Sequence, residues 1–118
     1  MILASVRMNI PRRNHDDALK ILRSIAEESR ILLGCISSRV YTDTEEDTVI
    51  AYEETWKSEE DLESHLRSKV YNKLLLVMEM SLQSPEVNFH TVSTSGGIEM
   101  IEKARSSRIV EEGQLSME

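Results

Sequence analysis

The chain has 118 residues, with 21 Asp and Glu against 14 Lys and Arg, and a formal net charge of −7. Because nucleic-acid binding depends on clustered Lys and Arg, this acidic balance argues against a nucleic-acid partner, and the length predicts a single domain. Apolar stretches fall short of the roughly 20 residues of a membrane span, and the N-terminal charges follow the apolar run, the reverse of a secretory signal. We therefore expect a cytoplasmic protein with no membrane partner.

Residues 2–10 alternate in polarity, as expected for a strand with one apolar face. Pro11 ends this strand because proline cannot donate to a strand ladder. The segment 14–34 predicts an amphipathic helix, with Asn14 as its N-cap and Gly34 just past its end. Its apolar stripe consists of Ala18, Ile21, Leu22, Ile25, Ser29, Leu32 and Leu33.

Two β-rich runs, 35–42 and 48–56, flank the polar cluster DTEED and predict a hairpin. A second helical pattern begins after Ser58, which together with Asp61 resembles a capping box. This pattern has a break near Ser68, so we expect two helical pieces instead of one long helix.

Pro85 closes the helical region, and residues 86–93 predict a fourth strand. The order β-α-β-β-α-β predicts an α+β, ferredoxin-like fold, in which two helices cover one face of a four-stranded antiparallel sheet. We assign residues 1–95 to this domain and residues 96–118 to a short C-terminal helix and a polar tail. Because an apolar second face of the sheet would require a partner sheet, we predict a homodimer.

Three segments carry a resemblance to a known family: GC at 34–35, the hairpin end YEETW and the helical run KSEEDLESHLRSKVY. They are similar to the antibiotic biosynthesis monooxygenase (ABM) family of dimeric α/β-barrel proteins. The typical pattern there is glycine-cysteine, a strand, acid-x-tryptophan, then serine, a helical histidine and a following aromatic residue. The similarity covers roughly residues 1–95. The matching positions in this chain are Glu54, Trp56, Ser58, His65 and Tyr71.

The resemblance implies a small monooxygenase that needs no cofactor. Its substrate would be a small aromatic or quinoid molecule, such as an electron-rich phenol or quinol. It also implies a dimer in which each protomer keeps its own pocket between sheet and helices. Other members degrade haem, but the position of their ligating histidine corresponds to Leu75 in this chain. Because an aliphatic side chain cannot bind iron, we expect no haem and no other cofactor.

His65 and Asn9 are the candidate catalytic residues. An imidazole at position 65 would accept a phenolic proton, because histidine titrates near neutral pH, and Asn9 would hydrogen-bond a substrate oxygen. Trp56 and Tyr71 would bind the substrate as part of the pocket wall. In the alternative, structural interpretation, His65 bonds a nearby carbonyl or carboxylate and Trp56 is the largest core side chain.

Polar side chains interrupt the strand faces, and Arg39 and His90 are candidate substrate-binding residues among them. If these faces point inward, the two side chains would orient a substrate oxygen or carboxylate. Alternatively, they lie at a dimer interface or toward solvent in ordinary pairs, such as Arg39 with Glu53. The histidines and Cys35 lack the spacing of metal ligands, so no metal site is predicted.

Two kinds of function are therefore open: a cofactor-independent monooxygenase, or a non-catalytic dimeric module that binds a small molecule for regulation. The two differ at one point in the structure. Catalysis requires a substrate-sized void within hydrogen-bond reach of His65. A module without chemistry could bury His65 against Glu54 and leave no void beside it.

Overall fold

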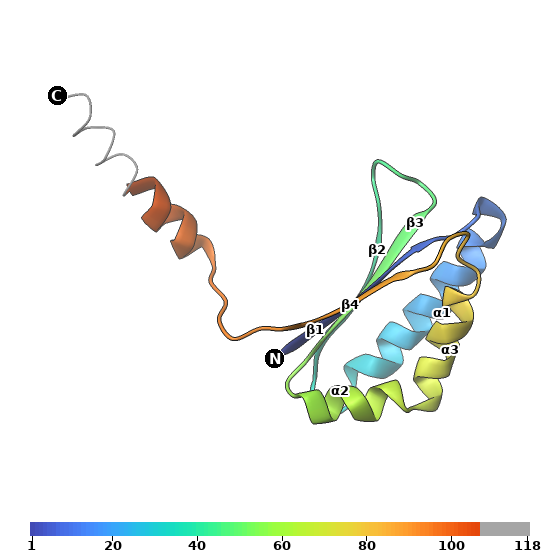
Figure 1. Cartoon of the computed structure of the whole chain (residues 1–118), viewed down its shortest axis with the longest axis horizontal. Coiled ribbons are helices and arrows are strands. Elements are labelled where there is room, and N and C mark those ends of the chain that lie inside the picture. The colour runs from blue at the N-terminus through green and yellow to red at the C-terminus, as the bar shows by residue number, and fades with distance from the viewer. Residues whose placement is uncertain (107–118) are drawn as a thin grey trace.

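The computed structural model describes residues 1–106, and the part of the predicted polar tail at 107–118 lies outside the described residues (Figure 1). The chain forms one sheet and a layer of helices, followed by a separate C-terminal helix. In chain order the elements are β1 (Ile2–Asn9), α1 (Arg12–Arg30), β2 (Cys35–Thr42), β3 (Val49–Trp56), α2 (Glu59–Leu66), α3 (Lys69–Met78), β4 (Glu86–Thr91) and a helix at 98–106.

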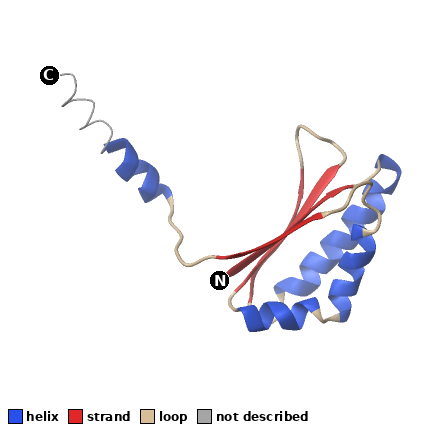
Figure 2. Cartoon of the chain, viewed as in Figure 1, coloured by secondary structure: helices blue, strands red, loops and turns tan. Residues whose placement is uncertain are grey.

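The four strands make one antiparallel sheet in the order β2-β3-β1-β4, so that β1 and β3 are central and β2 and β4 are the edges. The helices α1, α2 and α3 lie on the same face of this sheet (Figure 2). This arrangement confirms the predicted α+β, ferredoxin-like fold. Within residues 1–106, no helix is both long enough and apolar enough to pass through a bilayer.

The first helix begins and ends earlier than the sequence predicts. Its N-cap is Pro11, not Asn14, because the Asn14 amide already donates to the Pro11 carbonyl at 2.8 Å in the first helical turn. It ends at Arg30, so Leu33 lies outside the helix and is 89% exposed. Gly34 then adopts φ +87°, and a Cβ at this position would lie 2.2 Å from a carboxylate oxygen of Asp61, so glycine alone fits.

The other predicted elements are present, although some of their ends differ by one or two residues: the strand predicted at 86–93 is β4, which ends at Thr91. The hairpin connects β2 and β3 across residues 43–48, and the second helical region breaks as expected into α2 and α3. The side chain of Ser58 caps α2 by accepting from the Asp61 amide, and Ser68 caps α3 by accepting from the Tyr71 amide.

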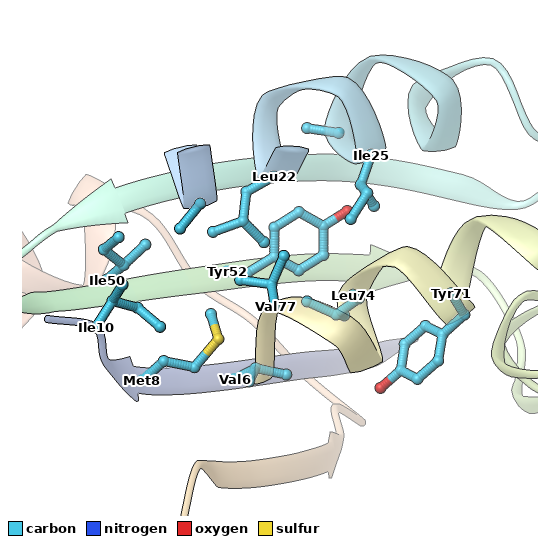
Figure 3. Close-up of a cluster of buried hydrophobic side chains, with 12 residues drawn as sticks. Val6, Met8, Ile10, Leu22, Ile25, Ile50, Tyr52, Tyr71, Leu74 and Val77 are labelled. Atoms are coloured by element: carbon cyan, nitrogen blue, oxygen red, sulfur yellow. The ribbon is translucent and has the colours of Figure 1, made fainter. Parts of the chain in front are cut away.

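The core fills the space between the sheet and the helices α1 and α3 (Figure 3). Tyr52 of β3 lies in the middle of this cluster, while Tyr71 of α3 lies at its edge. A second, smaller cluster lies beneath α2, where Trp56 packs with Ile2, Ala4 and Leu62. The period-two alternation of β1 and β3 directs every second side chain into these clusters.

The opposite face of the sheet is mostly polar. Its residues alternate with the buried ones, and the pairing register aligns Arg39 with Glu53, and Arg7 with Ala51 and Glu86. An apolar second face was the reason to predict a partner sheet, and this reason does not hold for these residues. The homodimer stays a prediction that needs a different structural basis.

We expect Leu22→Ala to lower the free energy of unfolding by about 2–5 kcal/mol, because Leu22 is fully buried and its truncation leaves a cavity. The matched control is Leu33→Ala, the same change at a side chain that is 89% exposed, and it should cost less than about 0.5 kcal/mol. Urea unfolding of both variants measures the difference. Equal losses would contradict the placement of one leucine in the core and the other outside α1.

Candidate functional site

Three of the predicted site residues meet at one end of the helix layer. The rings of Trp56 and His65 lie with their centroids 4.7 Å apart, and the ring of Tyr71 stands edge-on to His65 at 5.6 Å. Trp56 ends β3, His65 belongs to α2 and Tyr71 to α3. The structure therefore brings together aromatic rings from a strand and two helices around one imidazole.

Local sequence explains how these rings are held. The break between α2 and α3 depends on Ser68, whose hydroxyl donates to the His65 carbonyl at 2.6 Å and accepts from the Tyr71 amide at 3.2 Å. One serine therefore ends the helix that carries the histidine and starts the helix that carries the tyrosine. This turn directs both side chains toward the end of β3.

A chain of polar contacts is buried behind the rings, with Glu54 at its centre. The Tyr52 hydroxyl donates to Glu54 Oε2 at 2.6 Å, and the Ser38 hydroxyl lies 2.7 Å from the same tyrosine oxygen. On the other carboxylate oxygen, Glu54 Oε1, the Trp56 indole N–H donates at 3.4 Å and His65 Nε2 lies at 3.0 Å. Glu54 is only 2% exposed, so its charge is compensated almost entirely by protein groups.

The electrostatics favour an ionised Glu54. Burial by itself raises the pKa of this carboxyl, but the contacts from His65 and Tyr52 outweigh burial, and its pKa is lowered from the ordinary value. Burial and the nearby Glu54 charge raise the pKa of Tyr52 and that of Tyr71. The carboxylate therefore accepts hydrogen bonds, while both phenols keep their protons.

His65 is buried with its ring nitrogens incompletely satisfied. Nε2 is close to Glu54, but the N–H direction does not meet hydrogen-bond geometry, and Nδ1 has no hydrogen-bond partner in the described residues. A buried polar group without a partner costs roughly 1–3 kcal/mol. Such a group needs an explanation, and a catalytic role is one of the explanations that apply to buried unpaired polar groups.

A hollow of about 310 Å³ lies beside this cluster. On one side it is bordered by Trp56 and the exposed turn after α1, and on the other by α2 and the α2–α3 turn. The lining residues are Leu32, Leu33, Trp56, Asp61, Ser64, His65 and Ser68. Its size is at the lower end of the range for small-molecule pockets, about 300–1,000 Å³.

The other predicted site residues lie elsewhere. Arg39 and His90 are on the sheet face that points away from the helices, in register with Glu53 and Leu3. Asn9 is the last residue of β1, and Ile2, at the other end of this strand, pairs with Trp56. Asn9 therefore lies about 23 Å along the strand from the position that pairs with Trp56. Its backbone amide donates to the Ser81 hydroxyl. None of these three residues therefore reaches His65.

Reasoning from the sequence missed Tyr52 and Ser38 as parts of the site, and it named Glu54 only as a position of the family pattern and as a structural partner of His65. One signal was present: the run Tyr-x-Glu-x-Trp puts a carboxylate between two aromatic residues on the buried face of β3. An acid on an apolar strand face needs partners, and the structure shows that Tyr52 and Trp56 of the same strand and His65 of α2 supply them.

The sheet order and the one-sided helix layer define an α+β protein of ferredoxin-like fold, and the sequence defines its family. The family model for antibiotic biosynthesis monooxygenases matches residues 1–74. Because this match covers more than half of the chain, the protein belongs to the ABM family. Among curated protein sequences, no match is found.

Solved structures agree with this assignment at the level of the fold. A conserved protein from Methanosarcina mazei Go1 is 24% identical, with a TM-score of 0.71 over 75% of this chain and 89% of its own. An antibiotic biosynthesis monooxygenase is 17% identical, with a TM-score of 0.72, and the match covers 80% of this chain and 100% of that protein. Rv0793 from Mycobacterium tuberculosis is 21% identical, with a TM-score of 0.67, and the match covers 82% of this chain and 100% of Rv0793.

Replacing Glu54 by Gln should make the free energy of unfolding depend less on pH at acidic pH. The folded pKa of Glu54 lies below its ordinary value of 4.5. The ionised carboxylate therefore stabilises the fold fully above about pH 4.5 and loses this contribution as the pH falls through the lower folded pKa. Urea unfolding between about pH 3 and pH 7 measures the free energy of unfolding at each pH. As the pH falls, this free energy should decrease more steeply for wild type than for Glu54→Gln.

The control for this experiment is Glu53→Gln, the neighbouring glutamate on the polar face of the sheet, away from His65. It should keep the wild-type profile. If Glu54→Gln and wild type lose stability in parallel down to pH 3, the buried carboxylate is not stabilised by the contacts described above.

Proposed function

We propose that this protein is a small cofactor-independent monooxygenase that acts on an aromatic or quinol-type molecule, with Glu54 and His65 as its acid–base pair. The observation that carries the proposal is the 3.0 Å contact between Glu54 Oε1 and His65 Nε2, buried between the rings of Trp56 and Tyr71 and next to a hollow of about 310 Å³. Membership of the ABM family supports the reaction type.

The proposed proton transfer follows from the orientation of the imidazole. If the imidazole carries its proton on Nε2, which lies 3.0 Å from Oε1 of the ionised Glu54, His65 keeps a lone pair on Nδ1, and Nδ1 has no partner among the described residues. Nδ1 accepts the phenolic proton, and the adjacent carboxylate stabilises the imidazolium that forms. Glu54 is thus the positioning residue and His65 the catalytic base.

The phenolate formed in this way is electron-rich enough to reduce dioxygen directly. A phenol with a free ring C–H then takes one oxygen atom as a new carbonyl and becomes a quinone. The second oxygen atom leaves as water with the phenolic and ring hydrogens. The balance needs no external reductant.

Trp56 supplies the aromatic binding surface in this proposal, because it lines the hollow and aromatic side chains stack favourably on planar apolar ligands. Tyr71 stands edge-on to the imidazole and is not among the residues that line the hollow. Leu32 and Leu33, on the turn after α1, border the hollow and would cover the outer edge of the substrate. Because both nitrogens of His65 are buried, the substrate has to displace side chains between the hollow and Nδ1.

The burial of both ring nitrogens also favours a second candidate function. In a non-catalytic module, the pair of His65 and Glu54 only fixes α2 on the sheet, and the hollow binds a small molecule for regulation. As the family resemblance implies, we propose a homodimer for either function.

The test of the proposal is oxygen uptake with a panel of reduced quinols and polyphenols. We expect uptake by wild type and a loss of about 10²- to 10⁴-fold in kcat for His65→Ala, the range typical of general-base catalysis. His15→Ala is the matched control, since His15 contacts the Thr48 carbonyl at the opposite end of α1, and it should keep wild-type activity. Circular dichroism checks that each variant is folded.

Ligand binding is measured in the same samples by the fluorescence of Trp56, the only tryptophan of the chain. Quenching by a compound that causes no oxygen uptake would favour the binding module over the monooxygenase. Full activity of a folded His65→Ala would remove His65 from the mechanism.

A further inference from the structure

The turn after α1, residues 31–34, carries three consecutive aliphatic side chains at the mouth of the hollow beside His65. Ile31, Leu32 and Leu33 are 86%, 38% and 89% exposed, and Leu32 and Leu33 line the hollow itself. A single exposed leucine needs no explanation, but a contiguous apolar patch that borders a pocket is typical of a ligand-binding groove. We call these three side chains the aliphatic rim.

The turn that carries the aliphatic rim is held in place by backbone hydrogen bonds. The Leu32 amide donates to the Ser29 carbonyl at 3.0 Å, and the Cys35 amide donates to the Leu32 carbonyl at 3.2 Å. The Gly34 carbonyl accepts from the Lys57 amide at 2.8 Å, which ties the turn to the end of β3. The exposure of the rim is therefore a feature of an ordered turn.

The two walls of the hollow differ in polarity. The aliphatic rim and Trp56 form an apolar wall, whereas Asp61, Ser64 and Ser68 form a polar wall on the side of α2. These three polar residues are spaced by three and four positions, so they share one side of the helix and its following turn. A ligand that matches both walls has a hydroxyl-bearing head group and an apolar remainder.

The charge around the hollow disfavours an anionic head group. The carboxylate of Asp61 lines the hollow, and Glu59 and Glu60 precede it in the first turn of α2. Among the described residues that line the hollow, none is Lys or Arg. Because like charges repel, a neutral phenol fits this site better than a carboxylate or a phosphate.

The size of the aliphatic rim separates a ligand from larger partners. Complete burial of a Leu or Ile side chain removes roughly 60–120 Å² from water, so the rim offers roughly 200–350 Å². A specific protein interface buries about 800 Å² on each partner, so the rim alone is too small for one. The acidic first turn of α2 beside it repels the anionic head groups of a membrane surface.

We propose that the hollow binds a single-ring phenol or quinol with an apolar alkyl chain, the ring against Trp56 and the chain over Leu33 and Ile31. The ring rests on the function proposed above, and the chain is the new element. The hollow of about 310 Å³ is at the lower end for small-molecule pockets, so a longer ligand continues over its rim. Leu33 is then a specificity-determining residue that takes no part in the chemistry.

The test is binding of phenols with a methyl, butyl or hexyl chain opposite the hydroxyl, followed by Trp56 fluorescence in the full-length chain. For wild type, Kd should fall by about two- to fourfold per added methylene, the upper value being that of a methylene taken fully out of water. 4-Hexylbenzoic acid has the same ring and chain but a carboxylate head group. It should bind about tenfold more weakly than 4-hexylphenol, because its charge faces Asp61.

Leu33→Ser should reduce the gain in affinity to less than about twofold per methylene, because the chain then loses apolar contacts. Its Kd for methylphenol should stay near the wild-type value. The matched control is Leu76→Ser, the same change at a leucine of α3 that is 59% exposed and does not line the hollow. This variant should give the wild-type series, and circular dichroism checks that both variants are folded.

A wild-type Kd that is the same for the methyl and hexyl compounds would overturn the proposal. So would a Leu33→Ser series equal to that of wild type, or 4-hexylbenzoic acid binding as tightly as 4-hexylphenol. If Leu33→Ser abolishes binding to phosphatidylcholine vesicles or self-association in sedimentation and leaves the phenol series unchanged, the rim serves a lipid surface or a second copy instead.

Oxygen uptake with the same compounds separates this proposal from the proposed function. Chain-dependent binding without uptake would remove the monooxygenase activity for these compounds and keep the chain site. Uptake with a KM that does not depend on chain length would keep the enzyme and remove the chain site.

Discussion

The buried carboxylate of Glu54 is the constraint on which the arrangement of the site depends. A charge at this depth is tolerated only when hydrogen-bond donors and a counter-charge surround it. Tyr52 and Trp56 supply donors from the same strand, and His65 supplies the contact from α2. Ser38 extends the chain of contacts to β2. One acidic residue thus ties two strands and a helix together and fixes the orientation of the imidazole.

The break at Ser68 is the second requirement for this geometry. An uninterrupted helix would carry His65 and Tyr71 on one rigid cylinder, six residues apart and on different sides. Capping α3 at Ser68 turns the chain, so that both rings meet edge to face at 5.6 Å. The site therefore arises from a local rule of helix capping combined with a buried charge.

The exposed polar and apolar side chains of this fold lie in different places. The uncovered face carries charges in register, such as Arg39 with Glu53. Large exposed apolar side chains lie instead on the turn after α1, at Ile31 and Leu33, and on β4, at Val87 and Phe89.

The sequence by itself determined the element order, the hairpin, the cap at Ser58, the helix break near Ser68 and the ferredoxin-like class. These depend on alternation, helical periodicity and side chains that bond their own backbone within three or four residues. It also pointed to Trp56, His65 and Tyr71, through the resemblance to the ABM family.

Only the tertiary structure decided the rest. The contacts of His65 with Glu54 and of Ser38 with Tyr52 join residues that become adjacent only after α2 and β2 pack on β3. Arg39 and His90 were separated from His65 because strand register, which period-two alternation alone does not specify, put them on the opposite face. The exposure of Phe89 likewise depends on where α3 lies across the sheet. In each case the deciding contacts are long-range, and a local pattern carries no information about them.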